Sequence, residues 1–309
     1  MTIDFPIPDS SRREPGIAIV GVSGGAIDDV AVERGVQALK KSGLRVYNFY
    51  QPDQKFQRFA AADAGRVAQI HAAADHPDVD IVMALRGSYG LSRLLPLLNY
   101  KKLANSGKCF VGHSDFTALQ MALLAYENKS SVAGPMLCDD FTREDLSEFT
   151  LTSFFDCVRQ QRHTVRFDSA DADDILVSGV LWGGNLAMLT HLTGTPYFPQ
   201  IEQGILFVED IAEHPYRVER MMLQLHFAGV LARQKAIIFG NFSAYKLAPH
   251  DNGYNFDEMI RYLRSVISVP IITGLPFGHI KDKVSLVVGS QTTLISERGV
   301  VELVMDYQF

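Results

Sequence analysis

Cysteine is scarce in this sequence, with only three among 309 residues: Cys109, Cys138 and Cys157. They lack the C-x-x-C spacing of a zinc knuckle or a redox motif, and an odd, widely spaced set does not suggest a disulfide-stapled secreted domain. Cys109 and Cys138 lie in apolar surroundings, which indicates buried thiols. The cysteines therefore favour the reducing cytoplasm and argue against a cysteine-ligated zinc site.

The sequence also lacks long apolar runs and any excess of positive charge. Residues 1–15 have neither a basic start nor an apolar stretch, so they do not resemble a secretory signal, and no window approaches the ~20 apolar residues that cross a bilayer. The 29 basic residues are fewer than the 35 acidic ones, and they are scattered rather than clustered. We therefore expect neither a membrane nor a nucleic acid as a partner.

What is present is ordinary globular material, 47% hydrophobic and 21% charged, in a chain long enough for two domains. In the first half, short apolar runs at 17–22, 44–49, 80–85 and 109–112 alternate with longer amphipathic stretches such as 61–74. This alternation is typical of parallel strands joined by helices. It predicts an α/β fold whose N-terminal domain contains a doubly wound parallel sheet.

A polar, charged segment at 159–174 interrupts this pattern. It predicts an N-terminal domain at 1–160, a linker at 161–174 and a C-terminal domain at 175–309. We expect the second domain to be α/β as well, with a mixed sheet, and an apolar run at 204–208 predicts one of its strands. Apolar residues at i, i+3, i+4 and i+7 predict a helix with one buried face, and they are Val218, Met221, Met222 and Leu225.

The first candidate for chemistry is Gly112-His113-Ser114-Asp115, where an apolar strand gives way to a helix. A serine at such a turn projects its hydroxyl, and the backbone N–H groups that start the helix can hold an oxyanion. Serine is also a favoured N-cap residue, and Phe116 stands where the G-x-S-x-G elbow has its second glycine. Position alone leaves both a nucleophile and a helix cap open for Ser114.

A glycine-rich loop follows the predicted strand at 80–85, and its sequence is Arg86-Gly87-Ser88-Tyr89-Gly90. The loop lies at the carboxyl edge of the sheet, where open α/β folds bind ligands, and its backbone can lend an N–H group to an oxyanion. A simple turn between a strand and a helix is the alternative.

Two further candidates lie in the second half. Glu209 and Asp210 directly follow the strand at 204–208, and a carboxylate at a strand end can orient a histidine, although paired acids there are often solvated. His279 follows a Gly/Pro-rich loop, a usual place for a catalytic histidine and also for a surface one. Because neighbouring side chains on a strand point to opposite faces, Asp210 should face away if Glu209 faces the active site.

Signals for a metal or a nucleotide are weak. No histidine pair shows the H-x-x-x-H or H-E-x-x-H spacing of a helical zinc site, so we expect no metal. The segment at 21–25 (GVSGG) follows the first strand but lacks the third glycine of the G-x-G-x-x-G fingerprint. That departure favours a bare turn over a nucleotide site.

Together these segments resemble the LD-carboxypeptidase family of serine peptidases, also called muramoyltetrapeptide carboxypeptidases. RGSYGLSRLLPLL is similar to the family's RGGYG-x-SRLL, GHSDFTALQ to its G-[YFH]-SD-[IF]-TA, and WGGNL to its GGNL. GILFVEDIAEHPYRVERMMLQL is similar to its GILxLEDIxEHPxRVERML, and the block at 273–289 begins with its TGLPFGH. The motifs occur in family order from 84 to 289, so the resemblance covers nearly the whole chain.

The resemblance implies roles for individual residues. Ser114 matches the nucleophile, Glu209 the relay acid and His279 the general base, and the backbone N–H groups of Asp115 and Ser88 match the oxyanion hole. Ser88 is a departure, because the family usually has a second glycine there; a serine keeps the backbone N–H group and is expected to narrow the pocket. With the nucleophile in the predicted first domain and both helpers in the second, the active site is expected in the cleft between them.

The implied reaction is hydrolysis of the bond between the L-centre of meso-diaminopimelate and the terminal D-alanine of cytoplasmic murein tetrapeptides, during cell-wall recycling. The resemblance implies no cofactor and suggests a homodimer. An exo-acting enzyme also needs a group that holds the free carboxylate of its substrate, for which an arginine is suited by its charge. The candidate substrate-binding residues are Arg86, Tyr89, Arg93, Trp182, Asn185 and Arg217.

Two alternatives remain open on the sequence. Within the same superfamily, the chain is also similar to immunity peptidases that cleave aminoacyl-nucleotide antibiotics. A non-catalytic α/β protein that binds a ligand at the glycine turn of residues 21–25 is the second alternative.

The spacing of the histidines leads to a first prediction. Treatment with EDTA should leave the peptidase activity unchanged, because the expected chemistry uses a serine relay and the histidines lack metal-ligand spacing. Activity is measured before and after dialysis against the chelator. Strong inhibition that added zinc reverses would overturn the serine mechanism.

Overall fold

The computed structural model describes residues 14–170 and 174–309, and the chain divides into two compact units. Unit 1 comprises the described part of Met1–Val111 together with Met136–Leu146, and unit 2 comprises Gly112–Pro135 and Ser147–Phe309. Ser114 therefore belongs to the same unit as Glu209 and His279, whereas the predicted sequence domains separate it from them.

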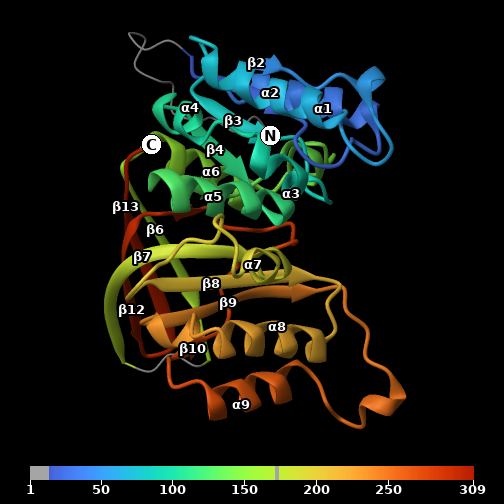
Figure 1. Ribbon diagram of the computed structural model, residues 1–309. Helices are drawn as coiled ribbons and strands as arrows, with labels where there is room; N and C mark the ends of the chain where they lie inside the picture. Colours follow the sequence, from blue (N-terminus) through green and yellow to red (C-terminus); the bar gives the residue numbers. More distant parts are fainter. Residues whose placement is uncertain (1–13, 171–173) are drawn as a thin grey trace. The chain divides into compact units, whose positions relative to one another are not determined.

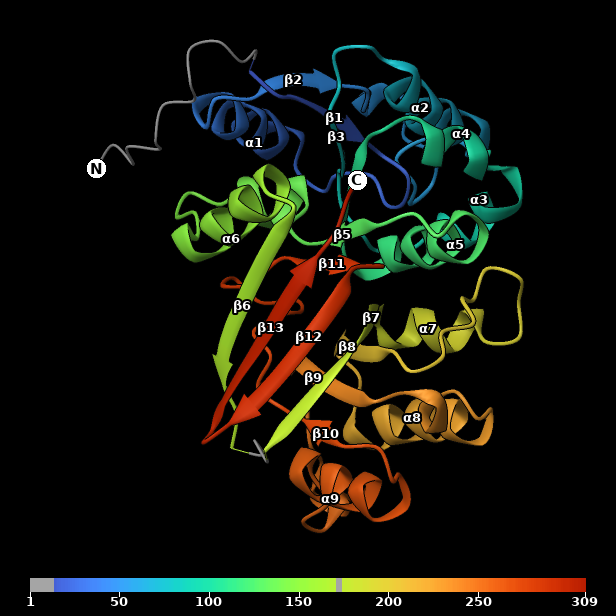
Figure 2. The same cartoon turned by 90° about the vertical axis from the view of Figure 1, so that its left-hand side faces the viewer.

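Unit 1 contains four parallel strands in the order β2-β1-β3-β4. They are β1 (Gly16–Val20), β2 (Arg45–Asn48), β3 (Ile81–Ala84) and β4 (Cys109–Gly112). Every residue of β1, β3 and β4 is buried, as expected for parallel strands with both faces covered. Helices α1 and α2 lie on opposite faces of this sheet (Figure 2). The doubly wound parallel sheet that the apolar runs predict is confirmed.

Helix α1 of unit 1 begins at a recognisable sequence signal. Helix α1 starts after Asp28, whose carboxylate accepts hydrogen bonds from the N–H groups of Val30 and Ala31, a standard N-cap. The helical segments of this unit are α1 (Asp29–Lys41), η1 (Pro52–Gln54), α2 (Asp63–Asp75), α3 (Leu91–Leu94), η2 (Leu95–Leu97), α4 (Tyr100–Asn105) and the turn η4 (Leu137–Phe141).

Unit 2 is built on a seven-stranded mixed sheet in the order β10-β9-β8-β7-β12-β13-β6. Strands β10 to β7 run parallel to one another, and the ladder from β7 through β12 and β13 to β6 is antiparallel (Figure 2). The predicted mixed sheet is confirmed. The strands are β6 (Arg162–Asp168), β7 (Ile175–Asn185), β8 (Ile205–Ile211), β9 (Ala236–Ser243), β10 (Ile271–Ile272), β12 (Gln291–Glu297) and β13 (Val300–Asp306). Outside this seven-stranded sheet, β5 (Ser131–Ala133) pairs with β11 (Leu286–Val288).

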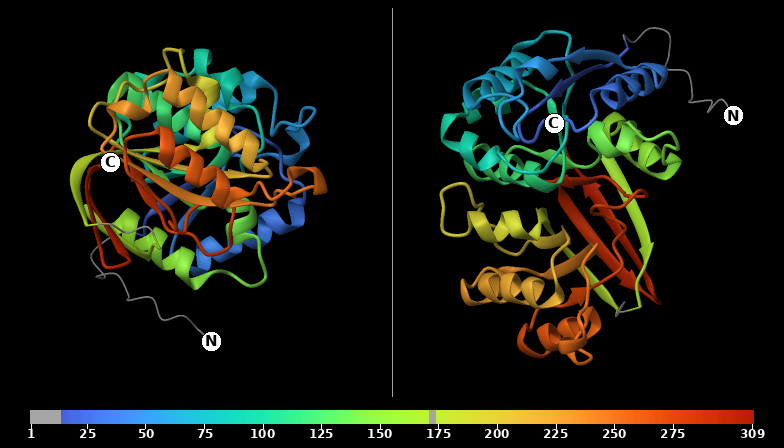
Figure 3. Two further views of the ribbon diagram at one scale, coloured as in Figure 1. Left: turned by 90° about the horizontal axis from the view of Figure 1, so that it is seen from below. Right: turned by 90° about the vertical axis from the view of Figure 1, so that its right-hand side faces the viewer.

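Three helices of unit 2 lie in a row beside the parallel half of this sheet, and they are α7, α8 and α9 (Figures 1 and 3). On α8, Val218, Met222 and Leu225 are buried as their spacing predicts, while Met221 is partly exposed. The helical segments of unit 2 are η3 (Ser114–Phe116), α5 (Thr117–Glu127), α6 (Glu148–Arg159), α7 (Leu186–Leu192), α8 (Pro215–Phe227), η5 (Leu231–Arg233), η6 (Pro249–Asp251) and α9 (Phe256–Val266).

The predicted linker at 161–174 differs from the structure over most of its length. Residues 162–168 form β6, which pairs with β13 at the edge of the mixed sheet. Its side chains alternate between buried and exposed, with His163, Val165 and Phe167 inward. Only three of seven residues face the core, so the segment is polar overall without being a loop. Residues 171–173 lie outside the described residues, and the domain bounds stay a prediction.

The burial of the cysteines and the lengths of the helices can be compared with what the sequence predicts. Cys109 and Cys157 are buried and Cys138 is partly buried, and within the described residues none of the three takes part in a disulfide. Burial raises the pKa of the Cys157 thiol to about 12, which keeps it protonated. None of the helices within 14–170 and 174–309 has both the length and the apolar character that a membrane span requires.

Two consecutive glycines at the end of β7 are required by close packing. Gly183 and Gly184 have φ of +135° and +139°, a region that other residues rarely adopt. A Cβ on Gly183 would clash with the carbonyl oxygen of Phe207 on β8, and one on Gly184 would lie 2.6 Å from Thr117 Oγ1 on α5. These glycines let β7 approach both neighbours closely.

A second prediction concerns this approach. Gly183→Ala should lower the free energy of unfolding by about 2–6 kcal/mol, because backbone strain and overpacking add. Gly229→Ala is the matched control, since Gly229 also has positive φ (+73°) but nothing lies within 4 Å of its Cβ position, and its loss should be about 1 kcal/mol. Denaturant midpoints measure both, and equal losses would contradict the packing described for Gly183.

Candidate active site

Ser114 lies on a tight turn between β4 and α5. Its φ is +61°, a strained value for a residue with a side chain, and the N–H group of Phe116 donates to the carbonyl of His113 at 3.1 Å. The ring of Phe116 packs so closely on Gly112 that a Cβ there would lie 2.7 Å away. The turn is therefore tight even though Phe116 replaces the second glycine of the elbow.

The helix-cap interpretation of Ser114 is not what the structure shows. The N-cap position of α5 is Phe116, and within the described residues no side chain caps that helix. A strained serine that does not cap a helix fits the description of a nucleophile elbow. Its catalytic role stays a prediction.

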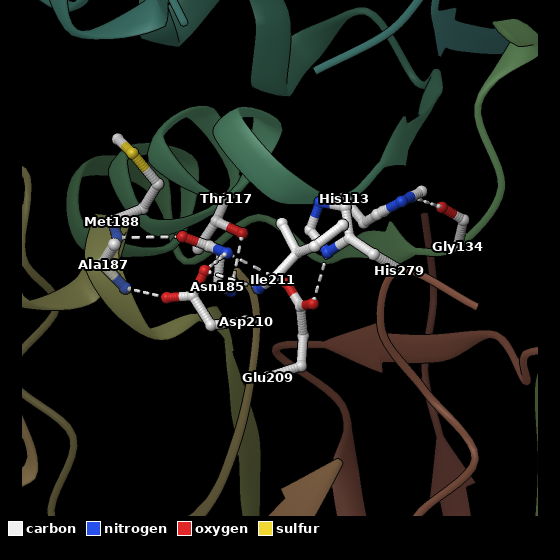
Figure 4. Close-up of polar contacts among 10 residues, drawn as sticks. All are labelled: His113, Thr117, Gly134, Asn185, Ala187, Met188, Glu209, Asp210, Ile211 and His279. Atoms are coloured by element: carbon white, nitrogen blue, oxygen red, sulfur yellow. Dashed lines mark hydrogen bonds and ion pairs between the residues drawn. The ribbon is translucent and has the colours of Figure 1, made fainter. Parts of the chain in front are cut away.

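Glu209 and His279 are brought together in unit 2. The Nδ1 atom of His279 lies 2.8 Å from Oε2 of Glu209, which is fully buried on β8 (Figure 4). Gly278 permits this approach, because its φ is +142° and a Cβ would lie 3.2 Å from the same Glu209 oxygen. Since a carboxylate only accepts, Nδ1 of His279 carries the hydrogen and Nε2 is left to act as a base.

The surroundings of His279 set its protonation. Burial alone lowers the pKa of His279, but the hydrogen bond and the charge of Glu209, together with the charge of Asp210, raise it, and Lys283 opposes them. The net effect is a pKa above the ordinary value of 6.5. A raised value makes this imidazole a stronger base than a free one.

His113 connects the serine turn to the relay pair. Its ring centroid lies 5.2 Å from that of His279, in an edge-to-face arrangement. Its Nδ1 lies 2.9 Å from the carbonyl oxygen of Gly134, so Nδ1 carries the hydrogen (Figure 4). Burial, followed by the charges of Lys283 and His279, holds the pKa of His113 well below its usual range. The sequence interpretation overlooked this neutral histidine, although it adjoins Ser114 in the GHSD motif.

Asp210 does not face away from Glu209, and that expectation is wrong. The pairing of β8 with β9 shifts register between Val208 and Asp210, which marks a β-bulge. A bulge breaks the alternation of side chains along a strand, and the carboxylates of both acids reach the side-chain amide of Asn185. Both are buried, and both lie within β8 rather than after it as the apolar run predicts.

Of the candidate substrate residues, three belong to unit 2. Trp182 is buried and its indole N–H donates to Gln234 Oε1 at 2.9 Å, so it occupies a core position and not a substrate-facing one. Asn185 is also buried, and its amide contacts Glu209 and Asp210. Arg217 is exposed and forms an ion pair with Glu213.

The remaining candidates belong to the glycine-rich loop of unit 1 and the helix that follows it. Arg86 donates to the carbonyl of Gly25 at 3.1 Å, Tyr89 is exposed, and the guanidinium of Arg93 lies over the ring of Phe59. Ser88 has φ of +83°, which favours glycine, and this accounts for the glycine usual in the family at this position. The roles of these residues stay predictions.

The glycine turn at 21–25 serves unit 1 as a packing element. The N–H group of Gly24 donates to the carbonyl of Gly87 at 3.0 Å, and that of Gly25 donates to the carbonyl of Arg58 at 3.1 Å. A phosphate cradle requires such N–H groups to point at a ligand, whereas these two are used within the protein. Across the described residues, no cluster of three or more histidine, cysteine or acidic side chains is arranged to hold a metal ion.

The chain is similar to known proteins over nearly its whole length. The model described as the LD-carboxypeptidase N-terminal domain matches residues 17–134, and that of the C-terminal domain matches 178–294. The crystal structure of muramoyltetrapeptide carboxypeptidase from Oxalobacter formigenes is 51% identical, with a TM-score of 0.91, over 95% of this chain and 100% of that one.

Two further proteins show how far the similarity extends. The murein tetrapeptide carboxypeptidase of Pseudomonas aeruginosa is 27% identical over 85% of this chain and 87% of its own. The microcin self-immunity protein MccF is 21% identical, with a TM-score of 0.87, over 96% of this chain and 98% of that one, which shows a shared fold. On the family models and the 51% identity over a whole relative, this chain belongs to the LD-carboxypeptidase family.

Proposed function

We propose that this protein is a serine carboxypeptidase that removes the terminal D-alanine from murein tetrapeptides, by hydrolysis of its bond to the L-centre of meso-diaminopimelate. The observation that carries the proposal is the buried Glu209–His279 hydrogen bond of 2.8 Å, beside the strained turn of Ser114. The 51% identity to a muramoyltetrapeptide carboxypeptidase supports the substrate class.

In the proposed mechanism, Nε2 of His279 takes the proton from the Ser114 hydroxyl as its oxygen attacks the carbonyl carbon of the diaminopimelate residue. Glu209 holds the imidazole through Nδ1 and stabilises the imidazolium that forms. The proton then passes to the departing amine of D-alanine. A water molecule, deprotonated by the same histidine, releases the acyl group from Ser114 and restores the enzyme.

The negative oxygen of the tetrahedral intermediate needs preorganised donors. We assign them to the backbone N–H groups of Asp115, which begins the helical turn after the nucleophile, and of Ser88. Each such donor lowers the barrier by about 3 kcal/mol. For the free carboxylate of the substrate, Arg86, Arg93 and Arg217 are the proposed partners, because a guanidinium forms paired hydrogen bonds with a carboxylate.

The proposal also covers the cell compartment, the oligomeric state and the partners of the enzyme. Murein tetrapeptides released during cell-wall recycling are a cytoplasmic substrate, so we place the enzyme in the cytoplasm. We also propose a homodimer and a reaction without a cofactor, with no nucleic acid or membrane as partner.

A third prediction tests this function. The protein, incubated with a free murein tetrapeptide, should release one alanine, seen by mass spectrometry as the tripeptide. Ser114→Ala should remove roughly three or more decades of kcat and leave the unfolding midpoint close to that of the wild type, because the nucleophile is lost and the fold is kept.

Other outcomes of that assay would favour a different function or a different nucleophile. Cleavage of an aminoacyl-nucleotide conjugate, without cleavage of the tetrapeptide, would show an immunity-type peptidase of the same fold. Full activity of Ser114→Ala would show that the nucleophile is another residue. A nucleotide that raises the melting temperature of a protein inactive on both substrates would favour a ligand-binding protein.

A fourth prediction concerns pH. Only neutral His279 accepts a proton, so kcat/KM should fall with decreasing pH through a pKa above 6.5. Glu209→Gln removes the carboxylate that raises this pKa, so the acidic limb should move to lower pH, while kcat falls by about 10⁴-fold with little change in KM. The pH profiles of both proteins provide the measurement. An unmoved limb, or an unchanged kcat, would show that Glu209 is not the relay acid.

A further inference from the structure

The amide of Asn185 lies between the two buried acids of β8. Its Nδ2 donates to Glu209 Oε1 at 3.3 Å and to Asp210 Oδ1 at 2.9 Å, and its Oδ1 accepts from the N–H group of Met188 at 3.2 Å (Figure 4). An amide nitrogen carries two hydrogens, so these two bonds use both. A flip of the amide would place its oxygen against two carboxylates, and the contacts therefore fix its orientation.

This orientation bears on the relay. Glu209 has one oxygen on the Asn185 amide and the other on His279 Nδ1. With both oxygens bonded, the carboxylate cannot rotate away from the imidazole without the loss of a hydrogen bond inside the protein. The backbone N–H group of Asn185 donates to Thr117 Oγ1 at 3.1 Å. This bond connects residue 185 to α5, the helix that follows Ser114.

Asp210 in turn holds Asn185. It accepts hydrogen bonds from Asn185 Nδ2 and from the N–H groups of Ile211 and Ala187, each at 2.9 Å. Three donors on one buried carboxylate leave it little freedom to move. The β-bulge that turns Asp210 inward is what makes these bonds possible.

Asp210 also contributes charge near His279. Burial, followed by the charge of Glu209, raises the pKa of Asp210 to about 6, so the group is mostly ionised at neutral pH. The charged or titratable groups that act on His279 are Glu209 and Asp210 from β8, Lys283 from the following loop, and His113 from the serine turn. Of these, Asp210 and Glu209 favour the imidazolium.

The geometry points to Asp210 as a positioning residue of the relay, which acts on Glu209 through the Asn185 amide. The inference rests on the proposed serine mechanism and deepens it. It gives Asn185 a role inside the protein, and the contact of Asn185 with the substrate stays a prediction. A purely structural role, in which Asp210 only fastens the start of α7, is the competing explanation.

The test uses Asp210→Asn, Asn185→Ala and the double variant. In Asp210→Asn, the new NH2 group must face either the Asn185 amide or the N–H of Ala187, so one donor loses its acceptor. We expect kcat on the tetrapeptide to fall about 10- to 100-fold in each single variant, with KM within about twofold, by analogy with the outer-shell partners that orient metal-binding histidines. Because both residues act along one path, the double variant should have a kcat no lower than that of the less active single variant.

A second readout does not depend on the natural substrate. A fluorophosphonate probe phosphonylates an activated serine hydroxyl with loss of fluoride, so its rate of labelling reports activation of Ser114 directly. The rate should fall with kcat in all three variants. In Asp210→Asn, the acidic limb of labelling should also move to lower pH, because one of the two negative charges near His279 is removed.

Asp251→Asn is the matched control. Asp251 is a mostly buried carboxylate of the same unit that bonds His214 Nε2 at 3.0 Å and has no contact with the relay in the described structure. The Asp251→Asn variant should be less stable than the wild type, while its labelling rate and the acidic limb of its labelling profile stay unchanged. Thermal unfolding of every variant separates loss of fold from loss of positioning, and Asn185→Ala tests the same path if Asp210→Asn does not fold.

The outcomes separate this inference from the proposed function. A wild type that is labelled but leaves the tetrapeptide intact would refute the substrate and still test Asp210 through the labelling rates. Labelling of folded Asp210→Asn at the wild-type rate and pH limb, or strictly additive losses in the double variant, would overturn the positioning role. A wild type that resists labelling would overturn both.

Discussion

The hydrogen bond between His279 and Glu209 is the interaction on which the rest of the site depends. A carboxylate removed from water is costly unless it is paired and hydrogen-bonded, and Glu209 is fully buried. Its surroundings are therefore specialised: Gly278 leaves room beside one oxygen, and the Asn185 amide donates to the other. The imidazole that this carboxylate holds is the group that the proposed chemistry needs to be basic.

Backbone geometry supplies the other half of the site. Ser114 has a left-handed φ of +61°, in a turn where the buried ring of Phe116 packs closely on Gly112. Such strain persists only where packing determines the conformation, and it exposes a hydroxyl that a regular helix would not. Gly184 also shapes the site, because its close approach to Thr117 on α5 lets the backbone N–H group of Asn185 donate to Thr117 Oγ1.

Local sequence patterns were sufficient for much of this. The apolar runs identified the strands of unit 1, and motif resemblance singled out Glu209 and His279, whose side chains do meet. Asp210 could not be predicted in the same way, because its direction depends on a bulge created by the pairing of β8 with β9, a contact between distant segments. The same limit applies to β6, a mostly polar strand that is recognisable only once β13 lies beside it.

The energetics of the two adjacent acids also bear on why position 210 holds a carboxylate. Its pKa is about 6 in the folded protein against 3.8 for a free group, so folding disfavours the ionised form. Because the pKa is raised, this group stabilises the folded protein in acid relative to neutral pH, and that contribution is lost as the pH rises through about 6. An asparagine at position 210 would avoid that loss. Its NH2 group would, however, face a group that now donates to Asp210, and that hydrogen bond would be lost. A carboxylate at position 210 therefore satisfies all of these donors in spite of the unfavourable ionisation, at the residue that fixes the orientation of Asn185 and, through it, of Glu209.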